Sequence, residues 1–327
     1  MKAVLINGDK SLSWSDVPDI TASPDEALVR VEYTGINRAD LMQRSGGYPP
    51  PPGAPEWMGL EISGTIEKLG DEAKEKCAFR EGDRVCALLG GGGYAEYAAV
   101  RYDMLMPIPD GFSMAEAAAF PEAVCTAYLN LFIEGQAKEG ETFLMQAGGS
   151  GLASVAIPLA KAFGLRVITT IRGESKLDKV KRLGADVIID TGKEDLADAL
   201  KAELERGTPV DVAVDCVGGE GMGRCLPYLA KGARWIMIAA LAGTETEIDL
   251  RNIYVRNIRI IGSTLRSRAP GFKAALVSEI ISKVYPKLSQ GMDKPVIYKI
   301  LPVAEAEAAH AILENNENTG KVVLKIG

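Results

Sequence analysis

Three glycines, Gly148, Gly149 and Gly151, are the residues of this 327-residue chain whose type and spacing point most directly to chemistry. They follow an apolar run at 143–147 and precede an amphipathic run at 152–163. Glycines let the backbone turn sharply and approach a pyrophosphate, while the first N–H groups of a following helix point at the anion. We therefore predict a phosphate-binding turn of a dinucleotide fold. The turn comprises Ala147, Gly148, Gly149, Ser150, Gly151 and Leu152.

A glycine cluster alone can also be a simple tight turn between a strand and a helix, so its context matters. Apolar residues recur at helical spacing after the glycines, and the β-branched run RVITT comes next at 166–170. Together these predict a strand-helix-strand unit of the expected size. Pro158 removes one backbone hydrogen bond, which predicts a bend in the helix.

Two other glycine clusters are weaker candidates. The cluster at 90–93 is followed by alternating aromatic and small residues, which predict a strand and offer no helix start to a phosphate. The cluster at 218–223 comes after the apolar run VDVAVDCV. We interpret it as the end of a later strand that faces the cofactor.

The choice of nicotinamide cofactor depends on the residues just after the second strand. An acidic side chain there would bind the ribose hydroxyls of NAD, but no acid ends this strand. Arg172, Ser175 and Lys176 are available to a phosphate instead, which favours NADPH. The alternative is that Arg172 and Lys176 are ordinary solvated charges at a helix start.

Composition indicates a globular enzyme, with 47% hydrophobic and 25% charged residues. The formal net charge of −7 disfavours a partner that is nucleic acid or an anionic membrane. The most apolar long segment, 117–133, contains Glu122 and is short for a bilayer span, and no cationic leader is evident. We expect a cytoplasmic protein that acts on a small molecule.

Cysteine and histidine usage argues against a metal site of the zinc-knuckle type. The five cysteines are an odd number and include no pair at the required short spacing, so we expect reduced and mostly buried thiols. The single histidine, His310, falls on a predicted helix near the C-terminus. We expect it to be at the helix surface or partly buried rather than catalytic.

The elements that position these residues form two groups. Residues 1 to about 120 are rich in strands and punctuated by glycine and proline. From residue 123 onward, six apolar runs alternate with helical patterns, which predicts a doubly wound parallel sheet and an α/β fold class. After about residue 264 the order is helix, strand, helix and strand, and we expect these elements to complete the first domain.

The run TGINRADLMQRSGGYPPPPGAPEWMGLEISG at 34–64, joined to QAGGSGLA at 146–153, resembles the zinc-independent, zeta-crystallin-like quinone oxidoreductase branch of the medium-chain dehydrogenase/reductase superfamily. PEAVCTAY, GSTLRSR and TGKVVLKIG extend the resemblance over the chain. It implies a GroES-like catalytic domain at 1–122 and 263–327, and a Rossmann domain at 123–262 with a six-stranded sheet. It also implies NADPH and a homodimer or homotetramer.

The chain departs from zinc-dependent relatives, which have a cysteine at or near Asn37 and a Gly-His-Glu motif where this chain has Gly59-Leu60-Glu61. Without a Lewis acid to polarise a carbonyl, reduction of an electrophilic quinone or conjugated enone fits better than alcohol oxidation. Other departures concern the cofactor. They are Gln146 in place of histidine, Ala153 in place of glycine, and Asp190 and Thr191 where some relatives have a tyrosine.

The resemblance also implies roles for single residues. Asn37 and Tyr48 match pocket positions, where a phenol could hydrogen-bond a developing oxyanion or donate a proton. Tyr48 could instead only pack beside the prolines, and Asn37 could cap the following helix. Arg266 and Arg268 could contact the cofactor or form a solvated basic loop. Besides the glycine turn and the three residues after the second strand, the implied cofactor-binding residues are Thr126, Cys216, Val217, Gly218, Ala239, Ala240, Leu241, Ser263, Leu265, Arg266 and Lys321.

Three functions stay open. The first is an NADPH-dependent quinone reductase, and the second is a reductase of enones or enoyl thioesters with the same hydride geometry. The third is a zeta-crystallin-like structural or RNA-binding protein, against which the acidic charge balance argues.

Overall fold

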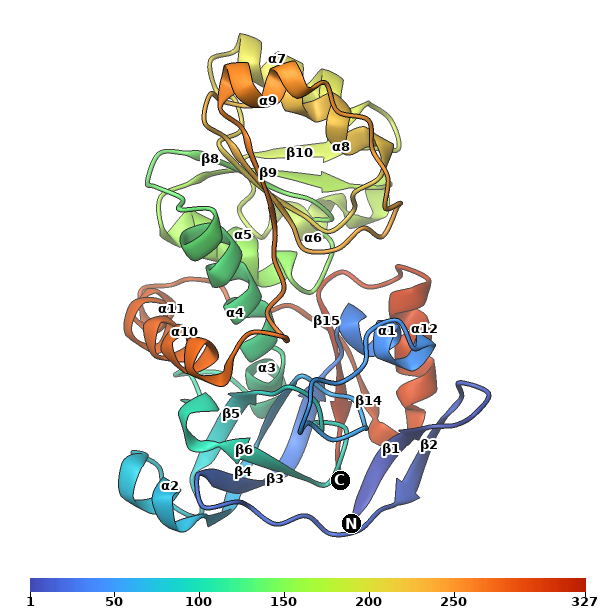
Figure 1. Cartoon of the computed structure of the whole chain (residues 1–327), viewed down its shortest axis with the longest axis vertical. Helices are drawn as coiled ribbons and strands as arrows, with labels where there is room; N and C mark the ends of the chain where they lie inside the picture. The colour runs from blue at the N-terminus through green and yellow to red at the C-terminus, as the bar shows by residue number, and fades with distance from the viewer. The chain divides into compact units, whose positions relative to one another are not determined.

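The computed structural model describes the whole chain, residues 1–327. The chain divides into two compact units (Figure 1): unit 1 comprises Met1–Cys125 and Arg266–Gly327, and unit 2 comprises Thr126–Leu265. The boundaries predicted from the sequence lie three residues earlier at both places. The first boundary falls inside the helix α4 (Pro121–Tyr128), where no local signal marks it.

Unit 2 contains the predicted doubly wound sheet. Its six strands are parallel and lie in the order β10-β9-β8-β11-β12-β13. They are β8 (Thr142–Met145), β9 (Arg166–Ile171), β10 (Val187–Asp190), β11 (Val212–Asp215), β12 (Arg234–Met237) and β13 (Arg259–Gly262). Each corresponds to one of the six apolar runs expected from the sequence, which confirms the predicted fold class.

Helices cover the sheet of unit 2 on two sides. In Figure 1, α7, α8 and α9 lie on one side of the sheet, and α5 and α6 lie on the other. This explains why central strands read as continuous apolar runs, since both of their faces are buried. The helices are α5 (Ala153–Ala162), α6 (Leu177–Lys181), α7 (Leu196–Glu205), α8 (Glu220–Cys225) and α9 (Leu250–Arg256), and a π-helix (Leu129–Glu134) continues α4.

Unit 1 is built on a seven-stranded sheet of order β14-β15-β3-β4-β5-β7, with β6 also paired to β3. A separate pair is formed by β1 and β2. The strands are β1 (Lys2–Ile6), β2 (Leu12–Asp16), β3 (Glu26–Gly35), β4 (Glu61–Leu69), β5 (Arg84–Leu88), β6 (Tyr97–Arg101), β7 (Leu105–Pro107), β14 (Ile297–Pro302) and β15 (Lys321–Lys325).

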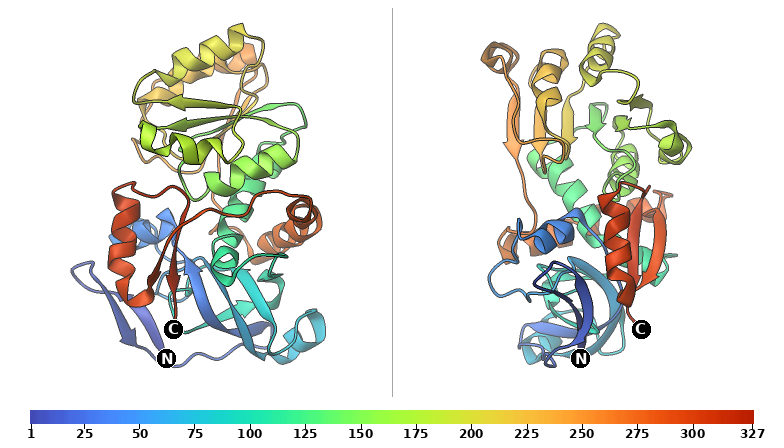
Figure 2. Two further views of the ribbon diagram at one scale, coloured as in Figure 1. Left: turned by 180° about the vertical axis from the view of Figure 1, so that it is seen from behind. Right: turned by 90° about the vertical axis from the view of Figure 1, so that its right-hand side faces the viewer.

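The C-terminal segment returns to this sheet, as the sequence predicts. The last strand, β15, runs antiparallel to β3, with Val323 opposite Gly35, and Figure 2 shows the C-terminal strands beside the N-terminal ones. Residues more than 280 positions apart therefore become neighbours. The helices of unit 1 are α1 (Arg38–Ser45), α2 (Asp71–Lys76), α3 (Met114–Ala118), α10 (Pro270–Lys283), α11 (Tyr285–Ser289) and α12 (Ala306–Glu314).

His310 differs from its prediction. It lies on α12 with its side chain fully buried, neither at the helix surface nor partly exposed. The helical pattern alone suggested one solvated face, but α12 packs against α1, β14 and β15, which encloses this position. The cysteines are all free thiols, and Cys86, Cys125 and Cys225 are buried. None of the helices combines the length and apolar character that crossing a bilayer requires.

Candidate active site

The loops that come after the strands of unit 2 share one edge of the sheet because all six strands are parallel. The strand order changes direction at β8, which has β9 on one side and β11 on the other. Ligands of open α/β sheets bind outside the carboxyl ends of the strands at such a switch point. The predicted glycine turn comes directly after β8 and therefore lies at this point.

The glycines of the turn are required by close neighbours. The N–H of Gly148 donates to the carbonyl of Thr170 at 2.7 Å. A Cβ at Gly148 would lie 2.4 Å from Oγ1 of Thr169, and a Cβ at Gly149 would lie 2.9 Å from Cδ of Lys176. Any larger residue would displace β9 or Lys176. The glycines thus let the turn pack closely against β9, as the phosphate-binding turn of a dinucleotide fold requires.

The turn leads directly into α5. Oγ of Ser150 accepts the N–H of Ala153, the first residue of the helix, at 3.1 Å. Ala147 has a φ of 58°, a left-handed conformation that costs a residue with a Cβ about 1 kcal/mol. The sequence has no signal for this strain, because alanine is not a turn residue.

The basic residues predicted to hold a phosphate lie just after β9. Arg172 and Ser175 are exposed and Lys176 is half-buried. Their loop is held by Asp190 at the end of β10, whose Oδ1 accepts the N–H of Gly173 at 2.9 Å. Lys176 lies against Gly149, so the structure brings it to the glycine turn.

Glu174 is an acidic residue within this loop that was not among the predicted site residues. It forms an exposed ion pair with Lys193. Its carboxylate is therefore directed to a neighbouring cation.

The ends of β11 and β12 are joined by backbone hydrogen bonds. The N–H of Leu241 donates to the carbonyl of Cys216 at 3.1 Å. Oδ1 of Asp215 accepts the N–H groups of Val217 and Gly218 at 2.7 and 3.0 Å. Burial raises the pKa of Asp215, and these donors oppose the rise. Ala239 and Ala240 lie in the same segment as Leu241.

Two further predicted residues lie just after β13, and one lies elsewhere. Ser263 and Leu265 are buried, and Ser263 donates its N–H to the carbonyl of Met237 at 2.9 Å. Thr126 lies on α4, outside the strand-end loops. Its carbonyl accepts a hydrogen bond from Nδ2 of Asn130 at 2.7 Å. Contact of these residues with a cofactor stays a prediction.

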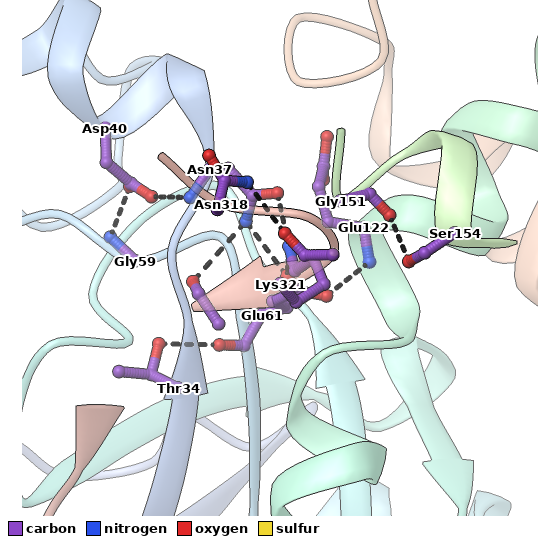
Figure 3. Close-up of polar contacts among 12 residues, drawn as sticks. Thr34, Asn37, Asp40, Gly59, Glu61, Glu122, Gly151, Ser154, Asn318 and Lys321 are labelled. Carbon is purple, nitrogen blue, oxygen red and sulfur yellow. Dashed lines mark hydrogen bonds and ion pairs between the residues drawn. The ribbon is translucent and has the colours of Figure 1, made fainter. Parts of the chain in front are cut away.

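In unit 1, Asn37, Glu61 and Lys321 form a polar cluster (Figure 3). Nδ2 of Asn37 donates to Oε1 of Glu61 at 3.0 Å, and Nζ of Lys321 donates to Oδ1 of Asn37 at 2.7 Å. Lys321 also forms an ion pair with Glu61. Glu61 is fully buried and Lys321 is 3% exposed. The amide of Asn37 is thus oriented by one anion and one cation.

Two backbone features complete the surroundings of Glu61. Oε2 accepts the N–H of Glu122 at 2.9 Å, so both carboxylate oxygens have donors. A Cβ at Gly35 would lie 2.3 Å from Oε1 of Glu61 and 2.8 Å from the carbonyl of Ala118. Glycine at position 35 therefore makes room for the carboxylate.

Asn37 is the N-cap residue of α1 and forms a capping box with Asp40 in the first turn, as the sequence allowed. Asp40 accepts the backbone N–H of Asn37 at 2.7 Å. The other oxygen of Asp40 accepts the N–H of Gly59 at 3.0 Å. Burial raises the pKa of Asp40 to about 6, against the effect of these donors.

Arg266 lies beside Tyr48 and is only 5% exposed, so the interpretation as a solvated loop residue is wrong. Its guanidinium donates to the carbonyl of Gly90 at 2.7 Å, to the carbonyl of Tyr48 at 3.3 Å and to Oε1 of Gln43 at 2.7 Å. It lies 5.3 Å from the centre of the Tyr48 ring. Burial raises the pKa of Tyr48, and the charge of Arg266 lowers it.

Glu61 and Asp40 were not among the predicted site residues. Each has a weak signal in the sequence, because Glu61 is a charged residue at the start of an apolar strand and Asp40 is a first-turn acid. Only the fold shows that they hold Asn37. The structure has no group of three or more histidine, cysteine, aspartate or glutamate side chains that could hold a metal ion.

Comparison with known proteins agrees with this architecture. Residues 23–110 match the alcohol dehydrogenase GroES-like domain, and residues 151–281 match the zinc-binding dehydrogenase family. The quinone oxidoreductase of Mus musculus is 28% identical over 95% of this chain and 92% of its own. The quinone oxidoreductase-like protein 2 homolog of Nematostella vectensis is 31% identical over 91% of this chain and 81% of its own.

Among solved structures, the quinone oxidoreductase from Thermus thermophilus, determined also in complex with NADPH, is similar over the full length of both chains. Its sequence is 33% identical and the TM-score is 0.83. These similarities, together with the GroES-like unit and the doubly wound sheet, show that this chain belongs to the quinone oxidoreductase branch of the medium-chain dehydrogenase/reductase superfamily, a group of nicotinamide-dependent oxidoreductases.

Proposed function

We propose that this protein is an NADPH-dependent quinone reductase that works without zinc. The observation that carries the proposal is a tight glycine turn at the switch point of unit 2, in a chain similar over its whole length to a quinone oxidoreductase studied with NADPH. When bound, the nicotinamide would supply the hydride, and the protein would supply binding, orientation and electrostatics.

The preference for NADPH is supported by the residues after β9. Arg172 and Lys176 offer positive charge to the ribose phosphate, and Ser175 offers a hydroxyl. The one acid in the loop, Glu174, is paired with Lys193. A phosphate held by charge-assisted hydrogen bonds would therefore bind better here than a ribose hydroxyl that needs a carboxylate.

Zinc independence is supported by the residues in unit 1 that stand where zinc-dependent relatives have metal ligands. Position 37 is an asparagine, whose amide is already engaged by Glu61 and Lys321. Position 60 is a leucine that is 1% exposed. Neither supplies the thiolate or imidazole that structural and catalytic zinc sites use. A substrate that is already electrophilic, such as a quinone, needs no Lewis acid to accept hydride.

Tyr48 is the group we propose to contact the substrate oxygen. Its phenol could hydrogen-bond the oxygen on which charge develops, and Arg266 beside its ring favours negative charge at that place. We propose that Asn37, fixed by Glu61 and Lys321, shapes the same pocket within unit 1.

The test is a screen of NADPH and NADH oxidation by the purified protein with benzoquinones, larger quinones, enals and trans-2-enoyl thioesters. We expect quinone-dependent oxidation with a clear preference for NADPH and no effect of metal chelators. Activity on enoyl thioesters without activity on quinones would select the enone reductase alternative. A preference for NADH would reject the cofactor proposal.

Tyr48→Phe tests the proposed role of the phenol. We expect turnover to fall by about tenfold at saturating NADPH, as for the loss of one hydrogen bond made in the transition state. The control is Tyr254→Phe, which changes a tyrosine that is 68% exposed on α9. Equal turnover of the two variants would reject the role of Tyr48.

A further inference from the structure

Asp40, Tyr94 and His310 form a buried polar group that extends from the site described above, and the roles of Tyr94 and His310 have not yet been accounted for. They come from α1, from the loop before β6 and from α12, and all three side chains are fully buried. The hydroxyl of Tyr94 lies 3.2 Å from Nε2 of His310. Burial raises the pKa of the Tyr94 hydroxyl well above its usual range, and the charge of the nearby Asp40 side chain raises it further.

The protonation of His310 decides which atoms of this polar group donate hydrogen bonds and which accept them. Burial lowers the pKa of His310 to about 4, so the ring is neutral near pH 7 and carries one N–H. Nδ1 is buried and has no hydrogen-bond partner. A proton on Nδ1 would leave a buried donor unsatisfied, whereas a proton on Nε2 leaves only an acceptor without a partner. Nε2 therefore donates to Tyr94, which leaves the proton of the Tyr94 hydroxyl to be directed toward Asp40.

Asp40 connects this polar group to the site. It accepts the N–H of Asn37 at 2.7 Å and the N–H of Gly59 at 3.0 Å. Asn37 immediately precedes α1, and Gly59 lies two residues before Glu61, the first residue of β4. The space at Gly59 is tight, because its φ is 106° and a Cβ would lie 2.6 Å from the backbone nitrogen of Tyr94. Asp40 thus links the two segments that carry Asn37 and Glu61.

We propose that Tyr94 and His310 are positioning residues of the reductase, whose directed hydrogen bonds hold the carboxylate of Asp40 and, through it, keep Asn37 in contact with Glu61. The proposal rests on the proposed function, since the contact between Asn37 and Glu61 matters for turnover only if the protein is a reductase. It assigns a purpose to a buried histidine, tyrosine and aspartate that packing alone does not require.

Ionisation of Asp40 should make the hydrogen bonds to its carboxylate, and with them turnover, depend on pH. Burial raises its pKa to about 6, while the donors Asn37 and Gly59 and the charges of Lys321 and Arg266 lower it. Above this pH the carboxylate accepts all its donors. As the pH falls through about 6, Asp40 binds a proton and becomes a weaker acceptor. Turnover should therefore fall on the acidic side.

The charged groups that face His310 do not change the conclusion that its pKa lies below that of Asp40. Burial is the main cause of its low pKa, the charge of Arg44 from α1 lowers the pKa further, and Glu307 on α12 raises it. Arg44 and Glu307 form an ion pair with each other. His310 is therefore neutral over the range in which Asp40 titrates.

The experiment uses the full-length protein with Tyr94→Phe, His310→Leu and His310→Gln. The control is Tyr285→Phe, which removes a hydroxyl that donates to the carbonyl of Pro107 at 2.8 Å, elsewhere in unit 1. For Tyr94→Phe we expect kcat to fall about tenfold with KM for NADPH changed less than about twofold. The acidic limb of the pH profile should move up by about one unit, because a carboxylate that loses a donor binds a proton more readily.

The histidine variants separate the hydrogen bond from packing. His310→Leu should shift kcat and the acidic limb in the same direction as Tyr94→Phe, whereas His310→Gln, whose amide N–H can replace Nε2, should restore both. In an Asp40→Asn background, Tyr94→Phe should add little, since the titrating group is gone. If Tyr94→Phe and Tyr285→Phe have the same kcat and lose activity at the same acidic pH, the proposal is overturned.

Hydrogen–deuterium exchange measures the same link without activity. We expect faster exchange of the amides in 36–40 and 58–62 in Tyr94→Phe than in Tyr285→Phe, with unit 2 unchanged. This result in a protein that oxidises no NADPH would support the positioning chain and reject the proposed function. Unchanged exchange in both segments would overturn the positioning chain whatever the activity.

Discussion

Lys321 and Glu61 form a buried ion pair although they are 260 positions apart in the sequence. Lys321 begins the last strand and Glu61 begins β4, and β3 lies between these strands in the sheet. Asn37 bridges the pair through both ends of its amide. The pair therefore joins β4 to the last strand of the chain, beside the place where the substrate pocket is proposed.

Glu61→Gln should destabilise unit 1. The substitution leaves the ammonium group of Lys321 buried without its anion, and breaking a buried pair in this way costs about 3–5 kcal/mol. The double variant with Lys321→Met should recover much of the loss, because no unpaired charge remains. The measurement is the urea midpoint of the two single variants and the double variant. Additive losses would show that the two charges do not interact.

Gly35→Ala should reduce turnover by displacing the carboxylate of Glu61. The new Cβ would lie 2.3 Å from Oε1, which forces the side chain away from Asn37. We expect kcat to fall by about tenfold, the effect of losing roughly one oriented hydrogen bond. Gly8→Ala is the matched control, since a Cβ at Gly8 meets nothing within 4 Å. Unchanged kcat in Gly35→Ala would mean that the position of Glu61 does not matter for turnover.

Arg172→Ala should weaken NADPH binding selectively. A charge-assisted hydrogen bond contributes about 1.5–3 kcal/mol, so KM for NADPH should rise by at least about tenfold while KM for NADH stays nearly constant. Arg182→Ala, at the end of α6, removes an exposed charge of the same sign as a control. An equal rise for both cofactors would place Arg172 away from the ribose phosphate.

His310→Gln should make the protein more tolerant of acid. The unfolded chain binds a proton at His310 with a pKa near 6.5, but the folded chain binds it only near pH 4. Protonation therefore favours the unfolded state as the pH falls from 6.5 to 4. By pH 4 it should lower the free energy of unfolding by about 3 kcal/mol. Asp40, whose pKa is raised to about 6, acts in the opposite sense.

The comparison of the two proteins isolates the histidine, because Asp40 is present in both. Urea unfolding at pH 7 and at pH 4.5 should show that wild type loses stability relative to the variant at the lower pH. A constant difference between the two proteins at both pH values would show that His310 titrates normally in the fold.

Local order along the chain was sufficient to predict unit 2. Each of its strands is a short apolar run, and each run is succeeded by a helical pattern, so the parallel sheet is predicted by alternation alone. The turn at Gly148 and Gly149 was predictable for the same reason, because strand, turn and helix are adjacent in sequence. The return of the C-terminal strand to the first domain was indicated by the strand pattern left over after the sheet was complete.

The tertiary structure decided which polar groups meet. The sequence shows a lysine in a C-terminal strand and a histidine on a helix, but neither carries a local signal that it is buried or paired. The burial of Lys321, Arg266 and His310 depends on segments far away in the chain that pack over them. Local periodicity reports which face of an element is apolar, whereas desolvation and partner choice arise only when distant elements pack together.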